Sequence, residues 1–159
     1  MDFFIDKEAR SWFQGISDEF GSAHGSRPAP DFDAFYFCFI AGIARRRKKH
    51  LSVGQTRQLV NYFPGVYDGR GSLLVALFLS RVLESRGIDS VERQNVRKVV
   101  SDLVHPQSEN FLSDEGVREF NEYAFGGFEV LQEWFDTRPT SLDVFLRTFK
   151  RRIDEAIPT

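Results

Sequence analysis

The chain has 159 residues, of which 42% are hydrophobic, and its 21 basic and 23 acidic side chains give a net charge of −2. This length fits one domain, spanning residues 1–159, that can bury its own core without disulfides or a structural metal. The near balance of charge excludes a basic nucleic-acid-binding tail and an acidic disordered chain. The single cysteine, Cys38, excludes a disulfide framework.

Signals for a metal, a cofactor or a membrane span are missing from the sequence. His24, His50 and His105 lie far apart, and none has a second His or Cys at ligand spacing, so we expect no metal and no cofactor. No apolar run reaches the roughly 18 residues that a membrane span needs. The N-terminus is acidic where a signal peptide would be basic. We therefore expect a cytoplasmic protein without a membrane partner.

The first half of the chain predicts helices around one central helix. Residues 3–20 have a usable helical face with a break near Gly15. Residues 31–49 open with Asp31 and Asp33, which suit a helix N-terminus, and continue as a run that is apolar on all sides. Periodicity alone cannot distinguish a buried strand from a buried helix there. The length of the run and its low content of β-branched residues favour a central buried helix.

Turn residues and apolar spacing predict the remaining helices. Their expected ranges are 52–62, 72–86, 89–104, 113–136 and 140–156. Turns are expected at Gly21–Pro30, at Tyr62–Gly71 and at His105–Ser108, where glycine, proline and small polar residues gather. No hairpin signal is found. The sequence therefore predicts an all-α fold, a single compact bundle of six to seven helices with a central apolar helix.

The pair Gly126-Gly127 falls within the apolar stripe of the predicted helix 113–136. A glycine inside a helix costs about 1 kcal/mol relative to alanine, so the pair needs a reason. Small residues would let another backbone approach closely, or would kink the helix. Packing inside the fold is the favoured interpretation, with a contact between subunits as the alternative.

Charge is distributed unevenly along the chain. Residues 31–100 hold twelve basic and six acidic side chains, and residues 101–159 hold six basic and twelve acidic ones. The strongest feature is a basic run, Arg45, Arg46, Arg47, Lys48 and Lys49. On a helix these side chains would wrap around its end, which suits a grip on a phosphate backbone. The alternatives are ion pairs with the acidic third of the chain, within one fold or between subunits, and a solvated surface without a partner.

Arg93 and Arg97 are further candidates for DNA contact. They are four residues apart and share one face of the predicted helix 89–104. If they converge with the basic run, the patch becomes large enough for a nucleic-acid groove. The alternative is that they are scattered surface arginines paired with nearby acids such as Glu92.

No catalytic residue can be assigned from the sequence. A metal-dependent nuclease needs converging carboxylates. Helix starts explain Asp31, Asp33, Asp114 and Glu115, and a solvated helix face explains Glu129 and Glu133. Cys38 lies in the most apolar stretch and is expected to be a buried, unreactive thiol. Whether the chain is an enzyme stays open, with a binding role favoured; if it is one, we expect a metal-dependent DNA nickase.

Two segments carry a resemblance to a known group of proteins. One is Phe32–Ala44, an acidic start followed by an apolar helix; the other comprises Phe111–Glu115 and Phe120–Leu131. They resemble the small helical proteins associated with bacterial DNA phosphorothioation (sulfur modification) and related phage-defence operons. The resemblance implies a defence-operon component that acts on or near DNA, and it supplies no catalytic motif.

The function predicted from the sequence is a small DNA-binding accessory subunit of a bacterial DNA-modification or phage-defence system. The basic run, with support from Arg93 and Arg97, would contact the phosphate backbone. The acidic C-terminal third would face other proteins of the operon or a second copy of the chain. The alternatives are a metal-dependent DNA-nicking endonuclease of such a system and a protein–protein adaptor without DNA contact.

Overall fold

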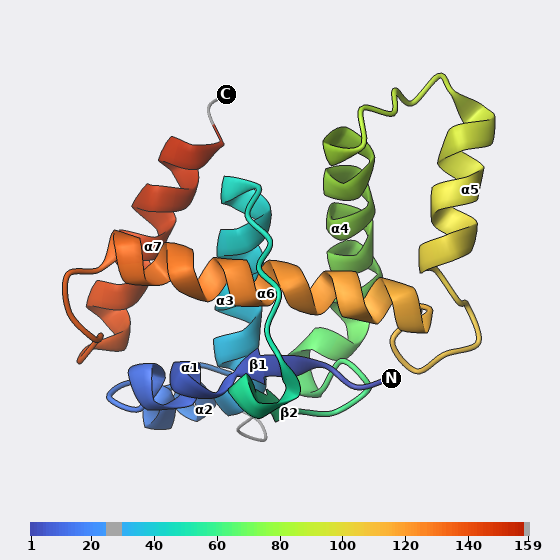
Figure 1. Ribbon diagram of the computed structural model, residues 1–159. Helices are drawn as coiled ribbons and strands as arrows, with labels where there is room; N and C mark the ends of the chain where they lie inside the picture. Colours follow the sequence, from blue (N-terminus) through green and yellow to red (C-terminus); the bar gives the residue numbers. More distant parts are fainter. Residues whose placement is uncertain (25–29, 158–159) are drawn as a thin grey trace.

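Helix α3, Pro30–Arg45, runs through the middle of the molecule, and α6, Asp114–Trp134, crosses it (Figure 1). The computed structural model describes residues 1–24 and 30–157. The other described elements are β1 (Phe4–Asp6), α1 (Lys7–Phe13), α2 (Ser17–His24), the 3₁₀ helix η1 (Val53–Gln55), β2 (Thr56–Gln58), the 3₁₀ helix η2 (Gly65–Arg70), α4 (Gly71–Ser85), α5 (Arg93–Leu103) and α7 (Leu142–Ala156). The predicted bundle of six to seven helices with a central apolar helix is confirmed.

Glycines on both helices allow α3 and α6 to cross closely. A Cβ atom at Gly127 would overlap the carbonyl oxygen of Cys38, and one at Gly42 would overlap the carbonyl oxygen of Tyr123. No side chain can be added at either position without moving a backbone. The predicted packing role of Gly126-Gly127 is confirmed, and the backbone that approaches Gly127 is that of α3.

Phenylalanine fills the core beneath this crossing. Phe120 of α6 is fully buried and stacks on Phe39 of α3 with ring centroids 3.9 Å apart. Among the described residues, the rings of Phe3, Phe35, Phe63 and Phe78 also lie about 5–6 Å from that of Phe120. Complete burial of such a side chain contributes about 1.5–3 kcal/mol, so this cluster is a major source of stability.

The N-terminal residues form a strand and not the helix predicted from residue 3. Phe3 and Ile5 are both buried, which is the two-residue alternation of a strand. β1 pairs antiparallel with β2, with Ile5 opposite Arg57, so the helix predicted over 52–62 is also wrong. The side chain of Asn121 fixes this strand, because its Oδ1 accepts a hydrogen bond from the amide of Phe4 at 3.1 Å.

The predicted helix boundaries hold best where a serine caps the first turn. Ser113 accepts a hydrogen bond from the amide of Gly116 at the start of α6, and Ser141 accepts one from the amide of Val144 at the start of α7. Helix α5 begins four residues later than predicted. The side chain of Asp89 instead accepts a hydrogen bond from the amide of Val91, which forms a turn before the helix.

The turn predicted at Gly21–Pro30 is wrong at both of its ends. Residues 21–24 belong to α2 and Pro30 opens α3. The intervening residues 25–29 lie outside the described part of the chain. Within that described part, no helix combines the length and the apolar character required to cross a bilayer.

Candidate functional site

The basic run leaves α3 at its C-terminal end. The helix ends at Arg45, Arg46 adopts a φ of 55°, and the amide of Arg47 donates a hydrogen bond to the carbonyl of Gly42 at 2.9 Å. This left-handed ending closes the helix. The prediction that helix 31–49 carries all five cations around its end is therefore wrong, and only Arg45 lies on the helix.

Beyond Arg46 the chain crosses the surface of α6 (Figure 1). The amide of Lys49 donates a hydrogen bond to the carbonyl of Glu122 at 3.0 Å. The carbonyl of Arg47 lies so close to Gly126 that a Cβ atom there would overlap it. Gly126 therefore makes room for the basic run, whereas Gly127 makes room for α3.

Four members of the basic run form ion pairs with acidic side chains of the fold. The paired atoms belong to Arg46 and Glu84 (2.5 Å), Arg47 and Glu129 (3.3 Å), Arg47 and Glu133, Lys48 and Glu119 (3.2 Å), and Lys49 and Glu129 (3.2 Å). Arg47, Lys48 and Lys49 thus pair with the acidic third of the same chain, an alternative that the sequence left open, whereas Arg46 pairs with Glu84 of α4. Contact between the basic run and DNA stays a prediction.

The ion pairs shift the protonation of their members. The hydrogen bond from Arg47 lowers the pKa of Glu133, and the hydrogen bond from Arg46 lowers the pKa of Glu84. The hydrogen bond to Glu133 raises the pKa of Arg47. Carboxylates with a depressed pKa stabilise the fold at neutral pH, and this contribution is lost as the pH falls through the lowered values.

Apart from Glu84 of α4, the acidic residues that contact the basic run form one stripe of α6. Glu119, Glu122, Glu129 and Glu133 recur at helical spacing, with Gly126 between them. The helical spacing is visible in the sequence. The sequence analysis assigned Glu129 and Glu133 to a solvated helix face, and so it did not predict their ion pairs with the basic run. Both residues are about half exposed, yet both hold Arg47.

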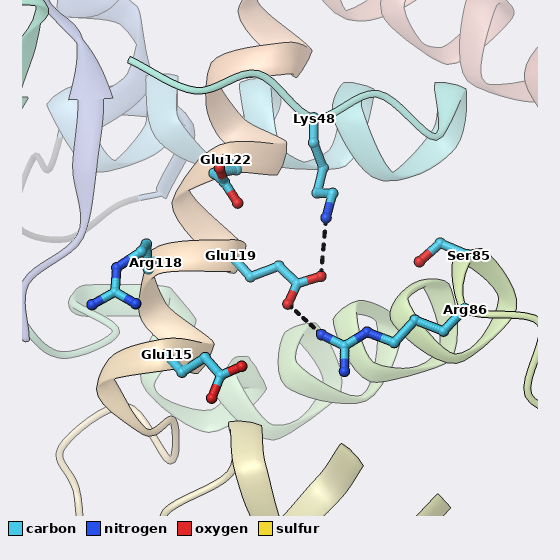
Figure 2. A pocket seen from close by; sticks show the side chains of 7 residues that line it. All are labelled: Lys48, Ser85, Arg86, Glu115, Arg118, Glu119 and Glu122. Atoms are coloured by element: carbon cyan, nitrogen blue, oxygen red, sulfur yellow. Dashed lines mark hydrogen bonds and ion pairs between the residues drawn. The ribbon is translucent and has the colours of Figure 1, made fainter. Parts of the chain in front are cut away.

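A charged pocket of about 490 Å³ lies at one end of this stripe (Figure 2). Its lining residues are Lys48, Ser85, Arg86, Glu115, Arg118, Glu119 and Glu122. The carboxylate of Glu119 is only 10% exposed and bridges Lys48 at 3.2 Å and Arg86 at 2.9 Å. Glu119 therefore links the basic run, the end of α4 and α6 through one buried charge, a role that the sequence analysis missed.

Replacing Glu119 with glutamine is expected to lower the free energy of unfolding by about 1–2 kcal/mol, because Lys48 and Arg86 lose their shared anion. Breaking a fully buried pair costs about 3–5 kcal/mol, and the two cations here are more than one-third exposed, which reduces the cost. Urea denaturation measures the change. Glu115→Gln, in the same pocket but without an ion pair to a described residue, is the control. Equal stabilities of the two variants would contradict the bridging role.

Arg93 and Arg97 lie on α5, apart from the basic run. In Figure 1, α4 stands between α5 and the segment that follows α3. The structure therefore does not bring the two predicted groups together. Both arginines are exposed, and neither side chain forms a hydrogen bond or ion pair with another described residue. The alternative, pairing with nearby acids such as Glu92, is not observed among the described residues.

The remaining residues considered for catalysis lie at helix starts or in the core, where a structural role explains them. Asp31 and Asp33 lie in the first turn of α3, and Asp114 and Glu115 lie in that of α6, as predicted. Cys38 is fully buried, as predicted, and this burial raises the pKa of its thiol. Within residues 1–24 and 30–157, no three His, Cys, Asp or Glu side chains are grouped so that they could hold a metal ion.

Comparisons with protein-family models, with curated proteins and with solved structures found no match for this chain.

Proposed function

We propose that this chain is a small DNA-binding accessory subunit whose contacts with the phosphate backbone are made by α5. The observation that carries the proposal is that Arg93 and Arg97 are exposed and that neither guanidinium group forms an ion pair or hydrogen bond with another described residue. A phosphate can approach these guanidinium groups without breaking an existing ion pair. Each contact would release counterions from the DNA and make binding salt-dependent.

Other basic segments are less favourable for phosphate contact. In the basic run, Arg46 to Lys49 are already neutralised by carboxylates, which would also repel a phosphate nearby. On α7, Arg147 pairs with Asp143 at 3.1 Å, and Lys150 pairs with Asp154 at 2.6 Å. Of the seven predicted cations, Arg45, Arg93 and Arg97 form no ion pair with another described residue, and α5 carries two of these three on one face.

The wider role in this proposal is that of a component of a bacterial DNA-modification or phage-defence system. The resemblance of Phe32–Ala44 and Phe120–Leu131 to helical proteins of phosphorothioation operons supports it. Other proteins of the same system are the proposed partners. Duplexes with and without phosphorothioate linkages are therefore both used in the experiment below.

The double variant Arg93→Ala/Arg97→Ala is expected to bind DNA more weakly and with less salt dependence. Loss of two phosphate contacts should reduce the slope of log affinity against log salt concentration by about 2. Fluorescence anisotropy of the full chain with a labelled duplex measures the slope. Arg147→Ala/Arg151→Ala is the control, because it removes two exposed cations at the same spacing from α7. Equal slopes for the two variants, or no binding by the unmodified chain, would contradict the proposal.

A further inference from the structure

Helix α5 has one side that faces the core and an opposite side that faces solvent. Val99 and Leu103 are buried, and Val96 and Val100 are half-buried, so this side of the helix faces the core. At about 100° per residue, Gln94 and Ser101 point most directly away from it. Both residues are exposed, and they stand seven residues, or about two turns, apart.

Basic side chains flank this outward line on both sides. Arg93 and Arg97 lie on one side of it, and Lys98 lies on the other. The nearby acids are engaged locally: Asp102 pairs with Lys98 at 3.2 Å, and Glu92 accepts a hydrogen bond from the amide of Asp89 at 2.6 Å. The face thus has neutral hydrogen-bonding groups at its centre, two arginines without an ion pair to a described residue on one flank, and the Lys98–Asp102 ion pair on the other.

This order matches the major groove of DNA. Phosphates line the two walls of the groove, and base edges form its floor, where glutamine can bind adenine through two hydrogen bonds and serine can bind several bases. The groove is about 12 Å wide and admits one α-helix. With eleven residues at about 1.5 Å each, helix α5 is long enough for its two central polar residues to face the floor of the groove together. It also lies at one edge of the molecule in Figure 1.

We infer that α5 enters the major groove, that Gln94 and Ser101 face the base edges, and that binding is therefore selective for sequence. This inference rests on the proposed function, because it assigns specificity to the helix that contacts DNA there. It favours duplex DNA over duplex RNA, since the major groove of RNA is deep and too narrow for such side chains.

Selection of binding sites by the full chain from a randomised duplex pool tests the inference. The expected result is an enriched sequence that includes adenine at a defined position. Gln94→Ala should reduce discrimination at that position by roughly tenfold, while its salt dependence stays that of the unmodified chain. Gln132→Ala, at an exposed position on α6, should keep the preference.

The outcomes separate this inference from the proposed function. Salt-dependent binding without any enriched sequence would overturn base reading by α5 and leave the backbone contact standing. An enriched sequence that Gln94→Ala and Ser101→Ala leave unchanged would also overturn it. A preference for duplex RNA would contradict the major-groove geometry. Failure of the unmodified chain to bind DNA would overturn both proposals.

Discussion

Replacing Gly127 with alanine is expected to lower the free energy of unfolding by about 2 kcal/mol or more. A Cβ atom at this position would overlap the carbonyl oxygen of Cys38, which belongs to the backbone of α3. Because the overlapping atom is a backbone oxygen, no side-chain rotation can relieve the clash, and α3 and α6 must move apart. Overpacking of this kind costs about 1–3 kcal/mol or more. The gain of about 1 kcal/mol in helix propensity offsets only part of this cost.

Chemical denaturation of the two variants Gly127→Ala and Gly54→Ala measures the effect. Gly54 is the matched control, because an added Cβ atom there meets no other atom within 4 Å. Its stability should change by less than about 0.5 kcal/mol. A Gly127→Ala variant as stable as the control would show that α3 and α6 do not cross at this distance in solution.

Truncation of Phe120 to alanine is expected to cost about 3–5 kcal/mol. The ring is fully buried and stacks on Phe39, and the rings of Phe3 and Phe78 also lie against it. Its removal leaves a cavity that α3, α4, α6 and the N-terminal strand would all have to close. Because the expected loss is a large part of a typical domain's stability, a partly unfolded variant is also consistent with it.

Phe120→Leu provides the graded comparison, since it leaves a smaller cavity and should cost less than the alanine variant. Tyr62→Ala is the control for loss of an aromatic ring, because Tyr62 is about half exposed. Thermal and urea unfolding should order the stabilities as Tyr62→Ala, then Phe120→Leu, then Phe120→Ala, the least stable. A loss below about 1 kcal/mol for Phe120→Ala would contradict the phenylalanine core.

Several elements could be predicted because local residues determine them. The capping hydrogen bonds of Ser113 and Ser141 are made within one turn, so α6 and α7 begin where the sequence indicates. The apolar stretch from Phe32 to Ala44 has few ways to avoid water other than as a central helix. Gly126-Gly127 is costly inside a helix, and that cost correctly indicated a close backbone contact.

Other elements depend on partners that are distant in the sequence. β1 and β2 have three residues each, and their pairing joins Phe4 to Gln58 across more than fifty residues. So short a pattern cannot be distinguished from a helix edge by periodicity. Likewise, Arg46 ends α3 in a left-handed conformation, and its neighbours then meet carboxylates of α6. The composition of the basic run predicted an anionic partner but could not show that this partner lies in the same fold.

The candidate DNA contact was predicted only in part. Arg93 and Arg97 share a face, as their spacing indicates, but their separation from the basic run depends on the arrangement of α3, α4 and α5. That arrangement follows from the buried faces of three helices and not from any local motif. The stripe of glutamates on α6 was visible at helical spacing, and matching it to the basic run would have predicted the ion pairs.

Removal of Lys48 and Lys49 tests whether DNA is bound by the basic run or by Arg93 and Arg97 of α5. In the full chain, Lys48→Ala/Lys49→Ala is expected to leave the salt dependence of DNA binding at the value of the unmodified chain, because both lysines already pair with glutamates of α6. Arg93→Ala/Arg97→Ala should reduce the slope by about 2 in the same anisotropy titrations. A reduced slope for the lysine variant, with an unchanged slope for the arginine variant, would contradict DNA contact through α5 and assign it to the basic run.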